Sequence, residues 1–315
     1  MKILILGSGG PFGTNLARFC LSQGIEVMGI TRTQKPECFS LGIQYPIHYY
    51  HLGYEQDYAL KVIANFNPDY IVNFAAQGEA AACWNEDNWR YYQTNCTDLV
   101  RLVSRVSGHF IQIGSSEVYG PVAYPVCETH PINPTSPYAV SKAAFDLHLI
   151  AMHHSNGLPV IVMRPSNCFS PGQQLHRIIP KTLLTALKGG KLPLHGGGIA
   201  RKSYLHATDL SRAILTVIQS GSIGEVYNVG PDDPTPIREI VERCLAVIKV
   251  SWDSVVQIAP ERIGQDSCYW LNSSKIKALG WKQSIEWDQG LNSMVDWIRN
   301  YPELLSMPTD FVMRA

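Results

Sequence analysis

A tyrosine and a lysine four residues apart are the residues best suited to chemistry in this sequence. Tyr138 follows Pro137 directly and Lys142 comes four residues later, and proline is favoured at the first position of a helix. At i and i+4 on a helix the two side chains project from one face. An ammonium near a phenol stabilises the phenolate, so we expect Lys142 to lower the pKa of Tyr138 and make it a general base.

A polar segment precedes this pair by about twenty residues. Ser115, Ser116 and Glu117 come directly after an apolar run at 110–113 that is typical of a buried strand. The carboxyl ends of strands form the ligand-binding edge of a doubly wound sheet, so we expect Ser115 to reach the same substrate hydroxyl as Tyr138. A surface Tyr-Lys pair and a simple helix cap are the alternatives, and the joint occurrence of these motifs with a glycine-rich loop disfavours both.

The glycine-rich loop lies at the start of the chain. Three glycines spaced GxxGxxG separate an apolar run from a helical pattern, the context in which a backbone approaches a pyrophosphate at a helix N-terminus. A tight turn without a ligand is the alternative. The residues expected to contact the cofactor here are Gly7, Gly10, Pro11, Phe12 and Gly13.

The end of the second apolar run decides which dinucleotide is expected. Many NAD-binding folds carry an acidic residue here against the ribose hydroxyls, but this chain has Thr31 and Arg32. Arg32 offers a planar cation for a ribose 2′-phosphate. We therefore predict NADP as the cofactor, with NAD as the alternative and a solvent-facing arginine as the non-functional interpretation.

Short apolar runs alternating with amphipathic stretches must position these groups. The runs at 3–6, 27–30, 70–74, 110–113 and 160–163 predict buried parallel strands with helices between them. We predict an α/β fold: a Rossmann-type doubly wound parallel sheet with a smaller C-terminal α/β substrate lobe. The predicted cofactor domain is 1–165 plus a returning segment at about 204–230, and the predicted lobe is 166–203 and 231–315.

The composition excludes several other functions. Among 315 residues, 26 Lys and Arg balance 26 Asp and Glu, so we expect no nucleic-acid partner. Eight scattered cysteines without zinc spacing predict neither a metal site nor disulfides and favour a reduced, cytoplasmic location. No apolar run reaches the roughly 18 residues of a membrane helix, so no membrane association is expected.

These motifs together resemble the extended short-chain dehydrogenase/reductase family, the NAD(P)-dependent sugar-nucleotide epimerases and dehydratases. The resemblance covers nearly the whole chain and includes Asn-Phe-Ala-Ala-Gln at 73–77, Ser-Ser-Glu-Val-Tyr-Gly at 115–120, the motif ending in Lys142, and Arg-Pro-Ser-Asn at 164–167. It implies that Ser115, Tyr138 and Lys142 form a catalytic triad. It also implies that Ala75 and Ala76 lie beside the cofactor.

The same resemblance implies a nucleoside-diphosphate sugar as substrate. Asn167, Lys202 and Arg262 match diphosphate contacts, and Arg201 is an alternative to Lys202. Glu79 stands where the family often has His, a departure that could alter how the sugar is held. Residues 88–106 and 137–154 match the helices that pair into a four-helix bundle, which implies a homodimer.

Glu117 distinguishes between members of the family. A 4,6-dehydratase needs a base for the C5 proton after oxidation at C4, and Glu117 is the candidate; Ser116 stands where dTDP-glucose dehydratases have Asp, so Ser116 and Glu117 would share the acid role. We predict a nucleoside-diphosphate-hexose 4,6-dehydratase that forms a 4-keto-6-deoxy sugar with a tightly bound nicotinamide cofactor. A 4-keto-sugar reductase or 4-epimerase is the main alternative. A non-catalytic NADP-sensing Rossmann protein is the alternative from another class.

Overall fold

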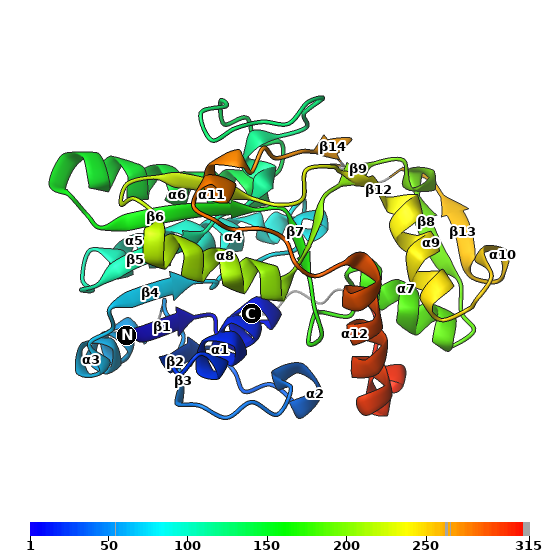
Figure 1. Cartoon of the computed structure of the whole chain (residues 1–315), viewed down its shortest axis with the longest axis horizontal. Coiled ribbons are helices and arrows are strands. Elements are labelled where there is room, and N and C mark those ends of the chain that lie inside the picture. Colours follow the sequence, from blue (N-terminus) through cyan, green and yellow to red (C-terminus); the bar gives the residue numbers. More distant parts are fainter. Residues whose placement is uncertain (54, 262–263, 265, 311–315) are drawn as a thin grey trace.

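Seven parallel strands form the central sheet of the computed structural model, which describes residues 1–53, 55–261, 264 and 266–310 (Figure 1). Their order is β11-β6-β5-β4-β1-β2-β3. The first three strands extend the sheet to one side of β1 and the later strands extend it to the other side, starting with β4. The predicted doubly wound sheet is therefore confirmed. The strands are β1 Lys2–Leu6, β2 Glu26–Thr31, β3 Ile47–Tyr49, β4 Tyr70–Asn73, β5 His109–Ile113, β6 Val160–Pro165 and β11 Val226–Val229.

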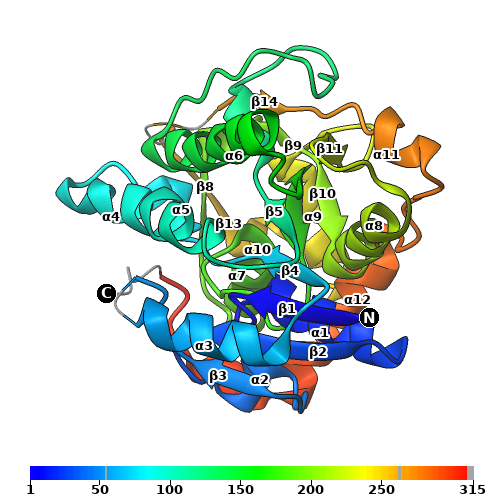
Figure 2. The same cartoon turned by 90° about the vertical axis from the view of Figure 1, so that its left-hand side faces the viewer.

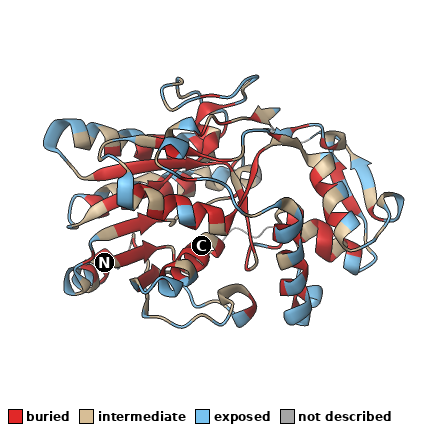
Figure 3. Cartoon of the chain, in the orientation of Figure 1, coloured by how far each residue is buried: buried red, intermediate tan, exposed pale blue. Residues whose placement is uncertain are grey.

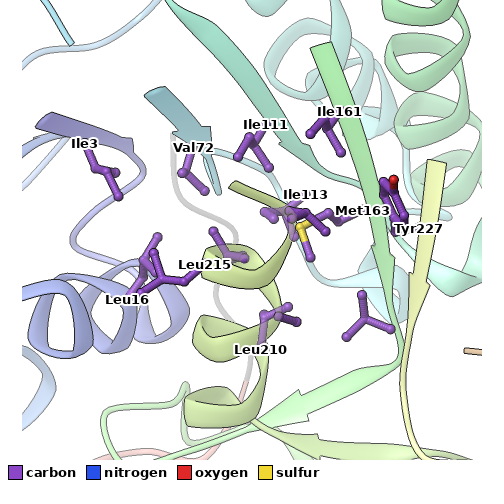
Figure 4. Packing of buried hydrophobic residues seen from close by; sticks show 14 of the residues in the cluster. Ile3, Leu16, Val72, Ile111, Ile113, Ile161, Met163, Leu210, Leu215 and Tyr227 are labelled. Carbon is purple, nitrogen blue, oxygen red and sulfur yellow. The ribbon is translucent and has the colours of Figure 1, made fainter. Parts of the chain in front are cut away.

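Helices cover both faces of this sheet, as Figure 2 shows. On one face α1 (Pro11–Ser22) and α8 (Ala207–Ser220) pack leucine side chains against β1, β4, β5 and β6, shown in close view in Figure 4. On the other face lie α3 (Gln56–Phe66), α5 (Asp98–Val103) and α6 (Pro137–Asn156). Because both faces are buried, as the red strands in Figure 3 show, each strand reads as a nearly continuous apolar run.

A smaller part of the chain lies at one end of the sheet (Figure 1). Three helices, α7 (Ile178–Leu187), α9 (Ile237–Val247) and α12 (Trp287–Asn300), share a buried core. Beside them lie the short α10 (Trp252–Val255) and two small sheets. The first sheet pairs β8 Leu192–His195 with β13 Val256–Ala259, and the second orders β12 Thr235–Pro236, β9 Arg201–Lys202 and β14 Cys268–Tyr269.

The segment between these parts returns to the main sheet. β10 (Tyr204–His206) pairs with β7 (Asn167–Phe169), after which α8 packs on α1 and β11 joins β6. This path supports the proposed division of the chain, with 204–230 belonging to the cofactor domain.

The helix expected over 88–106 is interrupted. It consists of α4 (Trp89–Tyr92), a π-helical turn at Gln93–Thr97, and α5. The remaining helices are short: α2 Glu37–Ser40, α11 Ser274–Ala278 and the 3₁₀ turns Ala80–Ala82, Glu86–Asn88, Ser116–Tyr119, Gly196–Gly198 and Pro302–Ser306. Within the described residues, no helix is both long and apolar enough to cross a membrane.

Candidate active site

The glycine loop lies where β1 meets α1, tightly packed against β4. Gly7 has φ 76°, and a Cβ there would lie 2.6 Å from the backbone nitrogen of Ala75. A Cβ at Gly13 would lie 2.7 Å from the carbonyl oxygen of Gly7, so only glycine lets helix, loop and strand come this close. Gly10 is the N-cap of α1 and provides no side-chain cap, and Pro11 follows at N1. The open helix N-terminus in this cradle suits a dinucleotide pyrophosphate.

The end of β2 borders a small hollow beside this loop. The hollow has a volume of about 120 Å³. Its lining includes Ser8, Gly9, Thr31, Thr33 and Lys35. Arg32 is half-buried and lies between Thr31 and Thr33 in the sequence. Lys35 is a second cation at this edge that the sequence analysis did not single out.

Tyr138 and Lys142 lie on the first turns of α6, the helix predicted for them. The Ser136 side chain caps this helix by accepting from the Ala139 amide at 3.1 Å. The Lys142 ammonium donates to the Ile113 carbonyl oxygen at 2.6 Å, and burial lowers the pKa of Lys142 to about 8. Helix α6 is thus tied to the end of β5.

The expected lowering of the Tyr138 pKa is wrong. Burial raises this pKa, the nearby Glu117 raises it further, and a hydrogen bond with Ser115 acts in the opposite direction. The expectation rested on the lysine charge alone, whereas the loss of hydration on burial favours the neutral phenol. Ser115 and Tyr138 lie within hydrogen-bonding distance of each other, which is compatible with the expectation that both reach one substrate hydroxyl.

The turn after β5 carries the serines and the glutamate. Ser115 opens a 3₁₀ turn and its Oγ accepts from the Glu117 amide at 3.2 Å. Ser116 is buried beneath the turn, with 3% of its surface exposed. Burial raises the pKa of the Glu117 carboxyl, whereas the cations Lys202 and Arg177 lower it. The net pKa of Glu117 is raised, and burial is the largest cause.

Three residues from the lobe surround Glu117 in a way the motifs did not reveal. The Tyr269 hydroxyl donates to Asp266 Oδ2 at 2.7 Å, and hydrogen bonding to Glu117 is among the causes that raise the Tyr269 pKa, after burial. The Lys202 ammonium lies 3.2 Å from the Tyr269 ring centroid and donates to the Asp266 carbonyl at 3.0 Å. No spacing signal links these positions, because β9 and β14 meet only in the folded lobe.

The described residues among the expected diphosphate contacts lie on two different strands, β7 and β9. Arg201 precedes Lys202 on β9, and its guanidinium donates to the Pro234 carbonyl at 2.9 Å, whereas Lys202 faces Glu117. Asn167 lies on β7, next to Tyr204 of β10. Arg262 lies outside the described residues. Arg201 and Lys202 therefore have separate surroundings.

Glu79 forms an ion-pair cluster with the segment before α7. Its carboxylate lies 2.9 Å from His176 Nε2 and 3.3 Å from Arg177, and Arg177 also donates to the Gly78 carbonyl. The Glu79 carbonyl accepts from the Tyr91 hydroxyl at 2.7 Å. The cluster lies close enough to affect the pKa of both Glu117 and Tyr138. In the described part of the chain, no three His, Cys, Asp or Glu side chains form a group that could hold a metal.

A dinucleotide cradle at the sheet edge and a Ser-Tyr-Lys group beside it define a Rossmann-fold nucleotide-dependent enzyme of the short-chain type. Residues 3–230 match the model of the NAD dependent epimerase/dehydratase family. The chain belongs to this family.

Named relatives are sugar-nucleotide enzymes. A trifunctional UDP-glucose 4,6-dehydratase/3,5-epimerase/reductase of Arabidopsis thaliana is 32% identical over 246 residues, 75% of this chain, and the chain spans only 37% of that protein's length. A dTDP-glucose 4,6-dehydratase of Streptomyces niveus is 31% identical, covering 95% of this chain and 93% of that protein. The structure of a dTDP-glucose 4,6-dehydratase of Streptomyces venezuelae with NAD bound superposes with a TM-score of 0.88, 27% identity, and coverage of 96% and 98%.

Proposed function

We propose that the protein is a nucleoside-diphosphate-hexose 4,6-dehydratase, a lyase that forms a 4-keto-6-deoxy sugar nucleotide. The observation that carries this proposal is the placement of Glu117. Its carboxyl lies beside the Ser115–Tyr138 contact, and Lys202 and Arg177 lower its pKa against the effect of burial. Dehydration needs a second proton acceptor here for the C5 proton, whereas oxidation or reduction at C4 alone does not.

The first step belongs to Tyr138, Ser115 and Lys142. Tyr138 takes the proton of the C4 hydroxyl while Ser115 holds the same oxygen, which leaves a ketone at C4. A nicotinamide cofactor held at the glycine loop would supply the hydride chemistry, as acceptor for C4 and donor for C6. Lys142 provides the nearby positive charge that the forming phenolate requires.

Glu117 performs the second step. The new ketone acidifies the C5 proton, Glu117 takes that proton, and the electron pair left at C5 expels the C6 hydroxyl. Burial raises the pKa of Glu117, so the protonated carboxyl can return a proton to the departing hydroxide, which leaves as water. The C5–C6 double bond that remains is reduced at C6, and C5 takes a proton that derives from solvent. We propose that Ser116 assists this acid step, as its place in the sequence suggested.

The remaining contacts of the substrate are proposed from the family resemblance and from the fold. Asn167, Arg201 and Arg262 are proposed diphosphate contacts. Lys202, given its position over Tyr269, is proposed to act mainly on Glu117. Glu79 is proposed to shape the sugar site through its ion pairs with His176 and Arg177.

We propose NADP as the cofactor, because Arg32 and Lys35 bring positive charge to the end of β2 and no acidic residue is present there. Gly7, Gly10, Pro11, Phe12, Gly13, Thr31, Ala75 and Ala76 are proposed cofactor contacts. The relative from Streptomyces venezuelae is bound to NAD, so NAD is the alternative that binding measurements decide.

A homodimer through α4, α5 and α6 is also proposed. Large apolar side chains are exposed on these helices, among them Trp89 at 54% and Leu147 at 51%. Such a patch favours burial in an interface. Analytical ultracentrifugation tests the dimer. All eight cysteines are unpaired, which supports the proposed cytoplasmic location.

The deciding experiment incubates the purified protein with dTDP-, GDP-, UDP- and CDP-glucose and follows products by mass spectrometry and NADPH by absorbance. Loss of one water without net cofactor consumption is the expected result. A keto sugar consumed with stoichiometric NADPH loss would instead identify a reductase, and inversion at C4 an epimerase. Cofactor binding with no turnover of any sugar would point to a non-catalytic sensor.

A further inference from the structure

A fully buried ion pair lies beneath the catalytic lysine. Arg164 on β6 donates to Asp146 Oδ2 at 3.1 Å, and the two side chains are 2% and 0% exposed. Asp146 follows Lys142 by four residues on α6, so Tyr138, Lys142 and Asp146 share one helix face. A buried pair of this kind often adds little to the stability of a protein, because both charges lose their hydration.

Arg164 also contacts the turn that carries Glu117. Its guanidinium donates to the Tyr119 hydroxyl at 2.9 Å and lies 5.1 Å from the Tyr119 ring centroid. The Tyr119 hydroxyl in turn donates to Asn228 on β11 at 2.8 Å. Tyr119 ends the 3₁₀ turn that begins at Ser116. One guanidinium therefore connects the helix of Tyr138 to the turn of Glu117.

Asp146 reaches toward the catalytic residues as well as toward Arg164. A Cβ at Gly114, the residue before Ser115, would lie 2.8 Å from Asp146 Oδ2, so glycine makes room for the carboxylate. Asp146 Oδ1 makes no hydrogen bond with any described residue. Asp146 is the charge that raises the pKa of Lys142 against the larger effect of burial. Burial also raises the pKa of Asp146 itself, whereas Arg164 and Lys142 lower it, so the charge of the carboxylate depends on both cations.

Other titratable groups near this pair lie on neighbouring elements. Glu128 accepts from the Asn228 amide at 2.8 Å and raises the pKa of Tyr119, after burial. His130 contacts the Tyr119 ring edge at 6.0 Å between centroids. Both are separated from Lys142 by Tyr119 and Arg164 in this chain of contacts. Asp146 is therefore the carboxylate that acts on Lys142.

We propose that Asp146 and Arg164 are positioning residues: Asp146 holds the Lys142 ammonium in its charged form, and Arg164 fixes Asp146 and the Ser115–Glu117 turn in one arrangement. The catalytic consequence rests on the proposed function, whereas the effect on the charge of Lys142 does not. Neither residue contacts the expected substrate, and neither belongs to the predicted catalytic set.

The test measures the titration of Lys142 directly in the full chain. Lysine labelled with ¹³C at Cε reports its own titration by NMR, and a Lys142→Met variant assigns the signal. Because D146N alone leaves a buried guanidinium unpaired and is destabilising, the double variant D146N/R164Q is compared with it. The exposed pair of Asp57 and Arg105 gives D57N as a matched control.

We expect the Lys142 titration to fall in D146N/R164Q, by up to about one pH unit, because Asp146 is the charge that raises the Lys142 pKa. D57N should leave it unchanged, and Y119F, which keeps both charges, should leave it nearly unchanged. In turnover of dTDP-glucose, the high-pH limb should move down by the same amount, because activity is lost as Lys142 loses its proton. An unchanged Lys142 titration in a folded D146N/R164Q protein overturns the proposal. Absence of turnover in the wild type would count against the proposed function alone.

Discussion

Replacing Glu117 with glutamine separates the two proton transfers of the proposed reaction. Glutamine keeps the size of the side chain and an acceptor oxygen for Tyr269, but it cannot take a proton from C5. General base catalysis contributes about 10²–10⁴-fold, so we expect turnover to fall by that factor. The first step should persist, because Glu117 raises the pKa of Tyr138 and its removal makes the phenol a slightly stronger acid.

The assay is exchange in deuterated water with dTDP-glucose as substrate. Wild-type protein should incorporate deuterium at C5, whereas Glu117→Gln should stop exchange yet still reduce its bound cofactor on adding the sugar, seen by absorbance. Glu242→Gln is the control, since it removes a carboxylate from an exposed ion pair on α9 and should retain exchange. Deuterium entering C5 at the wild-type rate in Glu117→Gln would refute the assignment.

Three further outcomes follow from the same structure. Arg32→Ala should weaken NADPH binding about tenfold or more, the effect of one charge-assisted hydrogen bond, while NADH binding changes little; fluorescence titration measures both, and equal losses would remove Arg32 from the site. Tyr269→Phe should slow C5 exchange several-fold and leave C4 oxidation intact, because it removes only the hydroxyl beside Glu117; equal slowing of both steps would contradict this. Gly7→Ala should destabilise the fold by more than about 1 kcal/mol in urea unfolding, and by more than Gly24→Ala, where φ is also positive at 70° but a Cβ would meet nothing within 4 Å. Equal costs would mean that φ alone, and not the contact with β4, requires glycine at position 7.

The sheet was predictable because each strand is buried on both faces. Ile3 and Ile5 face α1 and α8, while Leu4 and Leu6 face the other helices, so the run is apolar throughout and stands out from the amphipathic helices around it. That Ser115 and Tyr138 lie near each other was also predictable. Each belongs to a short local motif, and both motifs lie at the carboxyl edge of the parallel sheet.

The ionisation of the site was not predictable from spacing. A helix places Tyr138 and Lys142 on one face, but the pKa of each depends on burial, which the local sequence does not reveal. Lys142 donates to the Ile113 carbonyl, so part of its hydrogen-bonding capacity is already used within the protein. Burial and the charge of Glu117 raise the Tyr138 pKa, which is the opposite of the expectation from the motif.

Lys202 shows how the two parts of the chain combine to make one base. The alignment with the family suggested a diphosphate ligand, yet in the fold Lys202 is the stronger of the two cations that lower the pKa of Glu117. Burial by itself favours the protonated carboxyl, a form that cannot accept the C5 proton. The first part of the chain therefore supplies the carboxyl, and the lobe supplies a charge that lowers its pKa against the larger effect of burial.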